Sequence, residues 1–182
     1  IYANNPCTNV YFFMTWGYEK GFGDYEYTKE FEGMADTIHG GYMRIGEHYQ
    51  LPIVPVGKVW KRVKMGSRAN LYIHDKFHPS KKGSYLAAST FFSAFYDEEN
   101  RNYRPSGISK KMAKFISNQA YDLVHENRAY YSLDDQESLV HWKFNEDGTV
   151  AANFRAAFPS ALSYKWIIDG DKEITGDNGS FV

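Results

Sequence analysis

The residues best suited to catalysis stand together in "YIHDKFHPS" at positions 72–80, where Asp75 precedes His78 by three positions. A serine nucleophile needs a base to accept its proton, and that base needs an acid that fixes its tautomer and stabilises the imidazolium. An Asp and a His on one short loop can supply both groups. The loop follows a short apolar segment, residues 71–73, and precedes a helical pattern, which is typical of the functional edge of an α/β sheet.

The same residues allow two other interpretations. His74, Asp75 and His78 are all possible ligands of a divalent metal, although a metal site needs three or four converging ligands and this spacing matches no recognised metal motif. Alternatively, Asp75 turns the backbone and His78 packs in the core, while Pro79 and Ser80 begin a helix. For an arbitrary Asp-x-x-His sequence, this structural interpretation is the default.

Thr15 and Trp16 are a second pair of candidates, because they end a continuous apolar run at residues 10–16. Such a run predicts a strand that is buried on both faces, as in a parallel sheet. The end of that strand lies near the functional edge of the sheet, where both side chains could line a substrate pocket. Plain packing of Trp16 is an equally good interpretation.

The pattern up to residue 127 alternates buried strands with helices. After a Gly-rich aromatic loop at 17–27, apolar residues recur at helical spacing over 28–49, with Thr28 near the helix cap. Glycines in this range weaken the helix, and we expect them to allow close packing. We further expect a buried strand at 51–57 and helices at 59–65, 80–96 and 107–127. This order indicates an α/β fold.

After about residue 132 the pattern changes to alternation of apolar and polar residues. Strands with this alternation are expected at 140–144, 150–154 and 162–168 and around Ile174, separated by the turn sequences "NEDGT" and "DGDK". Period-two patterning with Asp-Gly turns predicts an antiparallel meander. We therefore expect an α/β domain at residues 1–130 and a small antiparallel β module at residues 131–182, whose few strands would also fit a truncated module.

Charge and cysteine content exclude several classes of protein. The 21 basic and 22 acidic residues give a net charge of −1, so nothing marks the chain as a nucleic-acid binder. A single cysteine, Cys7, excludes both an intrachain disulfide and a zinc framework of Cys and His. No stretch approaches the ~18 apolar residues of a membrane span.

The segment "LYIHDKFHPSKKGSYLAASTFFSAFY" (71–96) resembles the last conserved block of the SGNH hydrolases, the GDSL-type esterase and lipase superfamily. That block has the pattern Asp-x-x-His-Pro followed by the final helix. The segments "VYFFMTWGYEKG" (10–21) and "LPIVPVGKVWKRV" (51–63) resemble a strand and the Pro-Val-Gly-x-x-Trp motif of one branch of the family. The resemblance covers residues 8–96 and extends toward 127.

This resemblance implies an SGNH-type, flavodoxin-like three-layer α/β/α sandwich, incompletely represented in this chain. It implies ester hydrolysis by a Ser-His-Asp mechanism, in which His78 is the general base and Asp75 orients it. Acetylated carbohydrate is one substrate class that it suggests, and neither a metal nor an organic cofactor is needed. A secreted or cell-envelope location is likewise suggested by the family alone.

The sequence departs from the family at the nucleophile. No Gly-Asp-Ser-like turn precedes Asp75, and the Gly and Asn that complete the family's oxyanion hole are also missing. We therefore expect this chain to be the C-terminal part of a longer protein, inactive alone, whose N-terminal part supplies the serine. The alternative is a non-catalytic relative that binds a glycan or a protein.

Overall fold

The computed structural model describes residues 9–101 and 103–134, together with the strand segments 140–144, 150–155, 164–168, 172–176 and 180–181. The chain divides into two compact units, Val10–Asp135 and Ile1–Asn9 with Gln136–Val182. The first unit contains β1 (Phe12–Phe13), α1 (Phe31–Tyr49), β2 (Ile53–Val54), α2 (Val56–Gly66), α3 (Lys81–Tyr96), α4 (Lys110–Glu126) and the 3-10 helix η1 (Ala129–Tyr131).

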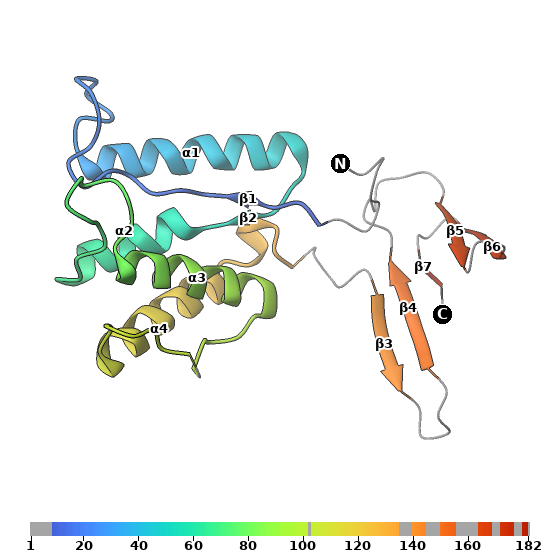
Figure 1. Ribbon diagram of the computed structural model, residues 1–182. Helices are drawn as coiled ribbons and strands as arrows, with labels where there is room; N and C mark the ends of the chain where they lie inside the picture. The colour runs from blue at the N-terminus through green and yellow to red at the C-terminus, as the bar shows by residue number, and fades with distance from the viewer. Residues whose placement is uncertain are drawn as a thin grey trace. The chain divides into compact units, whose positions relative to one another are not determined.

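The two strands of the first unit form a parallel pair joined through α1. Phe12 pairs with Ile53 and Phe13 pairs with Val54. In Figure 1, α1 lies on one side of the strands and α3 and α4 lie on the other, so helices cover both faces. The unit is therefore a compact α/β arrangement with a small parallel sheet. Both strands are shorter than the expected 10–16 and 51–57. Strand β2 is short because proline cannot donate to a sheet and helix α2 begins directly after Pro55.

Helix α1 begins later than the sequence suggests, and Thr28 is not its cap. The Thr28 hydroxyl donates to the Phe22 carbonyl at 2.7 Å and so closes the preceding loop. The N-cap position is Glu30, in extended backbone without a side-chain cap. The expectation that glycines allow close packing holds at Gly46, where an added Cβ would lie 2.6 Å from the Ile53 side chain.

The other helices form where the apolar periodicity predicts them, with shifted ends. Helix α2 begins at Val56, three positions before the expected start at residue 59, and buries its apolar face completely. Ser80 and Ser109 are the N-caps of α3 and α4, and each hydroxyl accepts a backbone N–H three residues on. None of the helices in this described part of the chain is both long and apolar enough to cross a membrane.

Helix α2 lies at the centre of the core of the first unit. It packs against α1, α3 and α4, and α3 packs against α4. The largest side chains that are fully buried include Trp60 on α2, Leu86 on α3 and Ile116 on α4. Tyr72, in the connection between α2 and α3, is also buried. The core therefore reaches directly beneath the loop that carries Asp75 and His78.

The second unit contains strands in two antiparallel groups. They are β3 (Val140–Phe144), β4 (Val150–Arg155), β5 (Tyr164–Ile168), β6 (Lys172–Gly176) and β7 (Ser180–Phe181). Strand β4 pairs with β3 and β7, whereas β5 pairs with β6 in a separate sheet, so the expected single meander is wrong. Alternation in sequence marks strands and short turns mark hairpins, but neither determines how hairpins combine. Of the two expected turns, residues 145–149 and 169–171 lie outside the described residues.

Candidate active site

A short antiparallel bridge holds the loop that carries Asp75 and His78. Tyr72 bridges Pro79, and the Ile73 N–H donates to the His78 carbonyl at 3.0 Å. Between them the backbone turns back on itself, and Lys76 takes a left-handed conformation with φ of 72°. The loop lies beyond the carboxyl ends of both strands, on the left-hand side of Figure 1. We call residues 73–78 the Asp–His turn.

The Asp75 carboxylate binds His78 through both its side chain and its backbone. Asp75 Oδ2 lies 2.7 Å from His78 Nδ1, and Asp75 Oδ1 accepts the backbone N–H groups of Phe77 and His78 at 3.1 and 3.0 Å. When Asp75 is ionised, Nδ1–H is the donor in this contact. The His78 lone pair is then on Nε2, which is the arrangement that a general base needs.

The electrostatics of the Asp–His turn favour an ionised acid beside an accessible base. Partial burial raises the pKa of Asp75, but hydrogen bonds from the side chain and backbone of His78 and from the backbone of Phe77 outweigh it, so the pKa falls to about 2. The side chain of Asp75 is 21% exposed, whereas that of His78 is 64% exposed. The acid is therefore sheltered and the base is open to a reacting group.

Trp16 links the end of β1 to the Asp–His turn. Its indole Nε1 donates to the Phe77 carbonyl at 3.0 Å, across 61 positions of sequence. The same ring stacks on Trp60 with centroids 4.2 Å apart and an interplanar angle of 6°. Tyr72 meets Trp60 edge-on, and its hydroxyl donates to the Gly17 carbonyl at 2.6 Å. Trp16, Trp60 and Tyr72, here called the aromatic stack, therefore fix the turn against the sheet.

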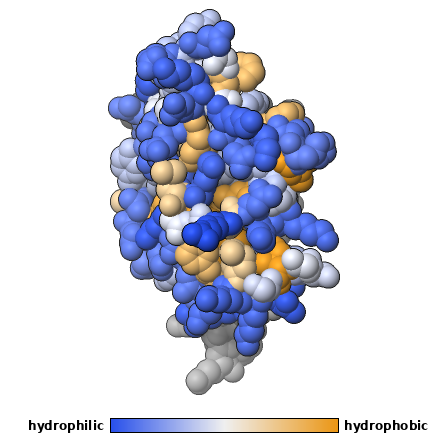
Figure 2. All heavy atoms as spheres, turned by 90° about the vertical axis from the view of Figure 1, so that its left-hand side faces the viewer, coloured by the Kyte–Doolittle hydropathy of each residue, from blue (hydrophilic) through white to orange (hydrophobic). Residues whose placement is uncertain are grey.

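The loop after β1 fastens the outer side of the turn. The Glu19 N–H donates to the Lys76 carbonyl at 2.8 Å, and the Lys76 ammonium lies 2.9 Å from the Glu19 carboxylate. The rings of Tyr18 and Phe77 lie 5.4 Å apart. Glu19 thus contacts both the backbone and the side chain of Lys76, and these contacts hold Lys76 in its left-handed conformation. Figure 2 looks onto this face and shows mostly hydrophilic residues, with apolar residues in patches between them.

Helix α3 begins at the turn and needs a small residue there. The Ser80 hydroxyl accepts the Gly83 N–H at 3.3 Å and donates to the Asn70 carbonyl at 2.9 Å. A Cβ on Gly83 would lie 2.4 Å from both the Leu71 carbonyl oxygen and the Trp60 ring. This glycine lets α3 approach the aromatic stack closely, so the start of α3 and the turn form one rigid piece.

The structure brings three of the four candidate residues from the sequence together. Asp75, His78 and Trp16 meet at the turn, whereas Thr15 lies exposed at the end of β1, and within residues 9–101 and 103–134 no hydrogen bond joins its side chain to the turn. Sequence reasoning did not assign a role to Trp60 or Tyr72. The Pro-Val-Gly-x-x-Trp spacing was the available signal for Trp60, but nothing in the sequence pairs it with Trp16.

The two alternative interpretations of the turn can be compared with its geometry. As the structural interpretation expects, Asp75 turns the backbone and Ser80 caps a helix, but His78 is exposed rather than in the core. For the metal interpretation, no three His, Cys, Asp or Glu side chains converge within the described part of the chain. His74 therefore does not join Asp75 and His78 in a ligand set there.

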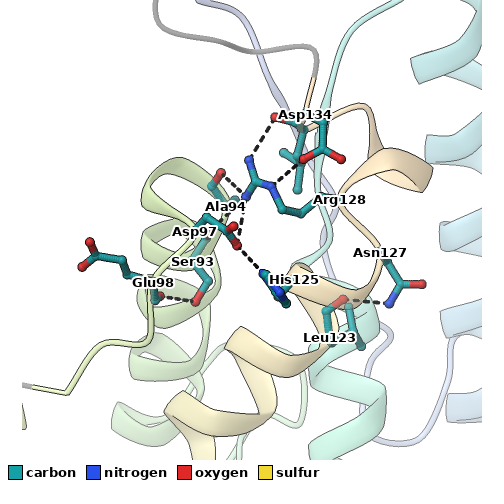
Figure 3. A network of polar contacts seen from close by, with 10 residues as sticks. Ser93, Ala94, Asp97, Glu98, Leu123, His125, Asn127, Arg128 and Asp134 are labelled. Atoms are coloured by element: carbon teal, nitrogen blue, oxygen red, sulfur yellow. Dashed lines mark hydrogen bonds and ion pairs between the residues drawn. The ribbon is translucent and has the colours of Figure 1, made fainter.

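A second aspartate–histidine pair lies at the other end of α3. His125 Nδ1 lies 2.8 Å from Asp97 Oδ1, and Arg128 Nη1 lies 3.6 Å from the same oxygen (Figure 3). Arg128 also donates to the last carbonyls of α3 and pairs with Asp134 at 2.7 Å. This network binds the C-terminal end of α3 to the end of α4 and to the segment after it. It provides a second aspartate–histidine pair with which Asp75 and His78 can be compared.

Compared with known proteins, the chain matches no family model and no curated protein. Its fold is similar to that of a solved structure, a DUF4886 family protein from Bacteroides uniformis, with a TM-score of 0.55 and 21% sequence identity. The match covers 64% of this chain and 48% of that chain. This chain thus spans about half the length of the protein that it resembles, and the likeness concerns the fold.

Proposed function

We propose that this chain carries the Asp–His part of an SGNH-type serine esterase. One observation carries the proposal: the Asp75 carboxylate binds Nδ1 of the exposed His78 and has no Lys or Arg nitrogen of the described residues within 4.0 Å. The acid accepts two further backbone N–H groups, so it orients the imidazole and can stabilise the imidazolium. The position beyond the carboxyl ends of two parallel strands is where α/β proteins place reactive groups.

The proposed reaction uses a serine from a segment outside this sequence. The serine hydroxyl attacks the ester carbonyl carbon while its proton passes to His78 Nε2. The tetrahedral intermediate then breaks its bond to the alcohol, which leaves with that proton. A water molecule attacks the acyl-serine in the same way, giving the carboxylic acid and the free serine. Asp75 stays ionised throughout, and the reaction requires neither a metal nor an organic cofactor.

An open strand edge supports the proposal that a further segment completes the site. Among the described residues, β1 pairs only with β2. Phe13, on β1, is 39% exposed as a residue. Its ring meets that of Phe91 edge-on at 5.1 Å, and Phe91 in turn contacts Phe95. An unpaired edge beside partly exposed rings is suited to another strand of a sheet. In the proposed three-layer sandwich, the N-terminal part of the same protein provides that strand and the serine.

The first substrates to test are small-acyl esters, with acetylated carbohydrates among them. This choice rests on the family resemblance, as does a secreted or cell-envelope location. The proposed function involves no binding to nucleic acid and no membrane-spanning segment.

The test is fluorophosphonate labelling of the full-length native protein, followed by peptide mapping. We expect one serine outside this sequence to react. His78→Ala should slow the labelling by about 10²–10⁴-fold, the usual contribution of a general base. His125→Ala is the matched control, because it removes the histidine of the other aspartate–histidine pair, and it should label at the wild-type rate. If the folded wild-type protein labels on no serine, the catalytic proposal fails and a non-catalytic binding role takes its place.

A further inference from the structure

A cavity of about 430 Å³ lies between α3, the loop that follows α3, and the first half of α4. Its volume is within the range of small-molecule sites. Its lining includes four cationic side chains and one carboxylate. The cations are Arg101, Arg104, Lys110 and Lys114, and the carboxylate is Glu99. We call this cavity the basic pocket.

The charges of the basic pocket are not balanced by the residues that the structure describes. Arg101 uses its Nε to bind the Glu99 carboxylate at 2.9 Å, so these two residues neutralise each other. No carboxylate of the described residues lies within 4.0 Å of a side-chain nitrogen of Arg104, Lys110 or Lys114. Three cations around one hollow repel one another, and an anion placed among them would relieve that repulsion.

Two features hold the basic pocket in shape. Arg104 Nη1 donates to the Ile108 carbonyl at 2.8 Å, which leaves the rest of its guanidinium for a ligand. Tyr103 is held by its backbone, because its N–H donates to Asn100 and its carbonyl accepts the Tyr85 hydroxyl at 2.9 Å. The Tyr103 residue is nevertheless 64% exposed. A fixed backbone with an exposed ring gives the pocket a flat apolar surface beside its cations.

We propose that the basic pocket binds an anionic sugar, with the acid group among Lys110, Lys114 and Arg104 and the sugar ring against Tyr103. A hydroxylated ring fits because every lining residue except Ala113 carries a side-chain group that can form a hydrogen bond. A nucleotide base can also stack on an aromatic ring, so the test below includes adenosine monophosphate. The pocket shares no lining residue with the Asp–His turn, so this proposal stands independently of the proposed esterase activity.

The test is a titration of the full-length protein with glucuronic acid, observed by ligand NMR, with glucose as the neutral match. Glucuronic acid should bind and glucose should not. A Lys110→Ala, Lys114→Ala double variant should bind at least about tenfold more weakly, as expected when charged contacts are lost. Lys111→Ala is the control, because Lys111 is exposed on the same helix but does not line the pocket. Added salt should also weaken binding, since exposed charges are screened.

Four results would overturn the proposal. Equal binding of glucose would show that the cations play no part. Inorganic phosphate binding as tightly as glucuronic acid, with no effect of Tyr103→Ala, would reduce the pocket to a simple anion site. Tighter binding of adenosine monophosphate would indicate a nucleotide site. Absence of binding by every probe to folded protein would exclude a ligand of this class. His78→Ala should leave binding unchanged, which separates this test from the esterase test.

Discussion

Two aspartate–histidine pairs lie at opposite ends of α3, and their contact distances are almost the same. His78 Nδ1 lies 2.7 Å from Asp75, and His125 Nδ1 lies 2.8 Å from Asp97. Both histidines are at least half exposed. The distance between an acid and an imidazole therefore does not by itself support a catalytic role, and any difference between the pairs must come from what else binds each carboxylate.

The surroundings of the two carboxylates differ in kind. Asp97 lies 3.6 Å from Arg128, a cation that also binds backbone carbonyls and Asp134. The charge of Asp97 is therefore part of an ion-pair network at the end of α3. Asp75 has two backbone N–H donors, and no Lys or Arg nitrogen of the described residues lies within 4.0 Å of it. His78 is thus the only basic side chain of the described residues that contacts the Asp75 carboxylate. These backbone donors fix the carboxylate in the position from which it orients the imidazole.

The largest expected effect comes from removing the charge of each acid in turn. Asp75→Asn should lower the rate of serine labelling, and of p-nitrophenyl acetate hydrolysis by the full-length protein, by about 10³–10⁴-fold, because an amide does not hold the required histidine tautomer. Asp97→Asn should leave both rates unchanged while lowering thermal stability. Equal loss of activity in the two variants would remove the distinction between the pairs.

The next largest effect is expected from a substitution at Gly83, which tests whether the start of α3 is held rigidly against the aromatic stack. Gly83→Ala should destabilise the protein by about 3 kcal/mol, because the new Cβ would overlap the Leu71 carbonyl and the Trp60 ring. Gly41→Ala is the control, since no atom lies within 4 Å of a Cβ there, and it should stabilise α1 by up to about 1 kcal/mol. Urea unfolding measures both. A neutral Gly83→Ala would mean that α3 can shift away from the aromatic stack.

A smaller effect on stability is expected from a substitution at the C-terminal end of α3. Arg128 is mostly buried and donates to the Ala94 and Leu133 carbonyls as well as to Asp134. Arg128→Ala should therefore cost about 2 kcal/mol of unfolding free energy, from lost charged hydrogen bonds. Serine labelling at low temperature should remain at the wild-type rate. If labelling falls as steeply as in His78→Ala, the two ends of α3 are coupled and the comparison between them fails.

The helices could be predicted from sequence because each has an apolar face that repeats within a few residues. The Asp–His turn could be predicted because its acid, base and following proline lie in one short motif. The contacts that fix the turn could not, because they join distant segments: Trp16 reaches the Phe77 carbonyl across 61 positions. The sequence predicts a helix over 28–49 with Thr28 near its cap, but the cap position is Glu30 and the Thr28 hydroxyl binds the Phe22 carbonyl.

Strand length and pairing were also beyond the sequence pattern. The apolar run at 51–57 predicts one strand, but Pro55 ends the sheet pairing and Val56 begins a buried helix, so buried strand and buried helix look alike over a few residues. In the second unit, the hairpins follow from local turns, whereas the pairing of β4 with β7 joins segments that no local signal connects.

The smallest effect concerns the pH dependence of stability at the Asp–His turn. The pKa of Asp75 is lowered from 3.8 to about 2, chiefly by hydrogen bonds that outweigh the opposing effect of its partial burial. A carboxyl group with a lowered pKa in the folded state stabilises the protein at pH values above its unfolded pKa, and that stabilisation is lost as the pH falls through the folded pKa. The stability difference between wild type and Asp75→Asn should therefore be constant near neutral pH and shrink between about pH 4 and pH 2.

Urea unfolding across this range, with the Asp75 carboxyl followed by NMR, measures the effect directly. A difference that stays constant down to the lowest pH would mean that the two backbone N–H donors, which an asparagine side chain can also bind, provide all of the stabilisation. A carboxyl resonance that titrates near its ordinary pKa would show that the contact with His78 is not maintained in solution. The Asp–His turn would then lack the side-chain contact through which Asp75 is proposed to orient His78.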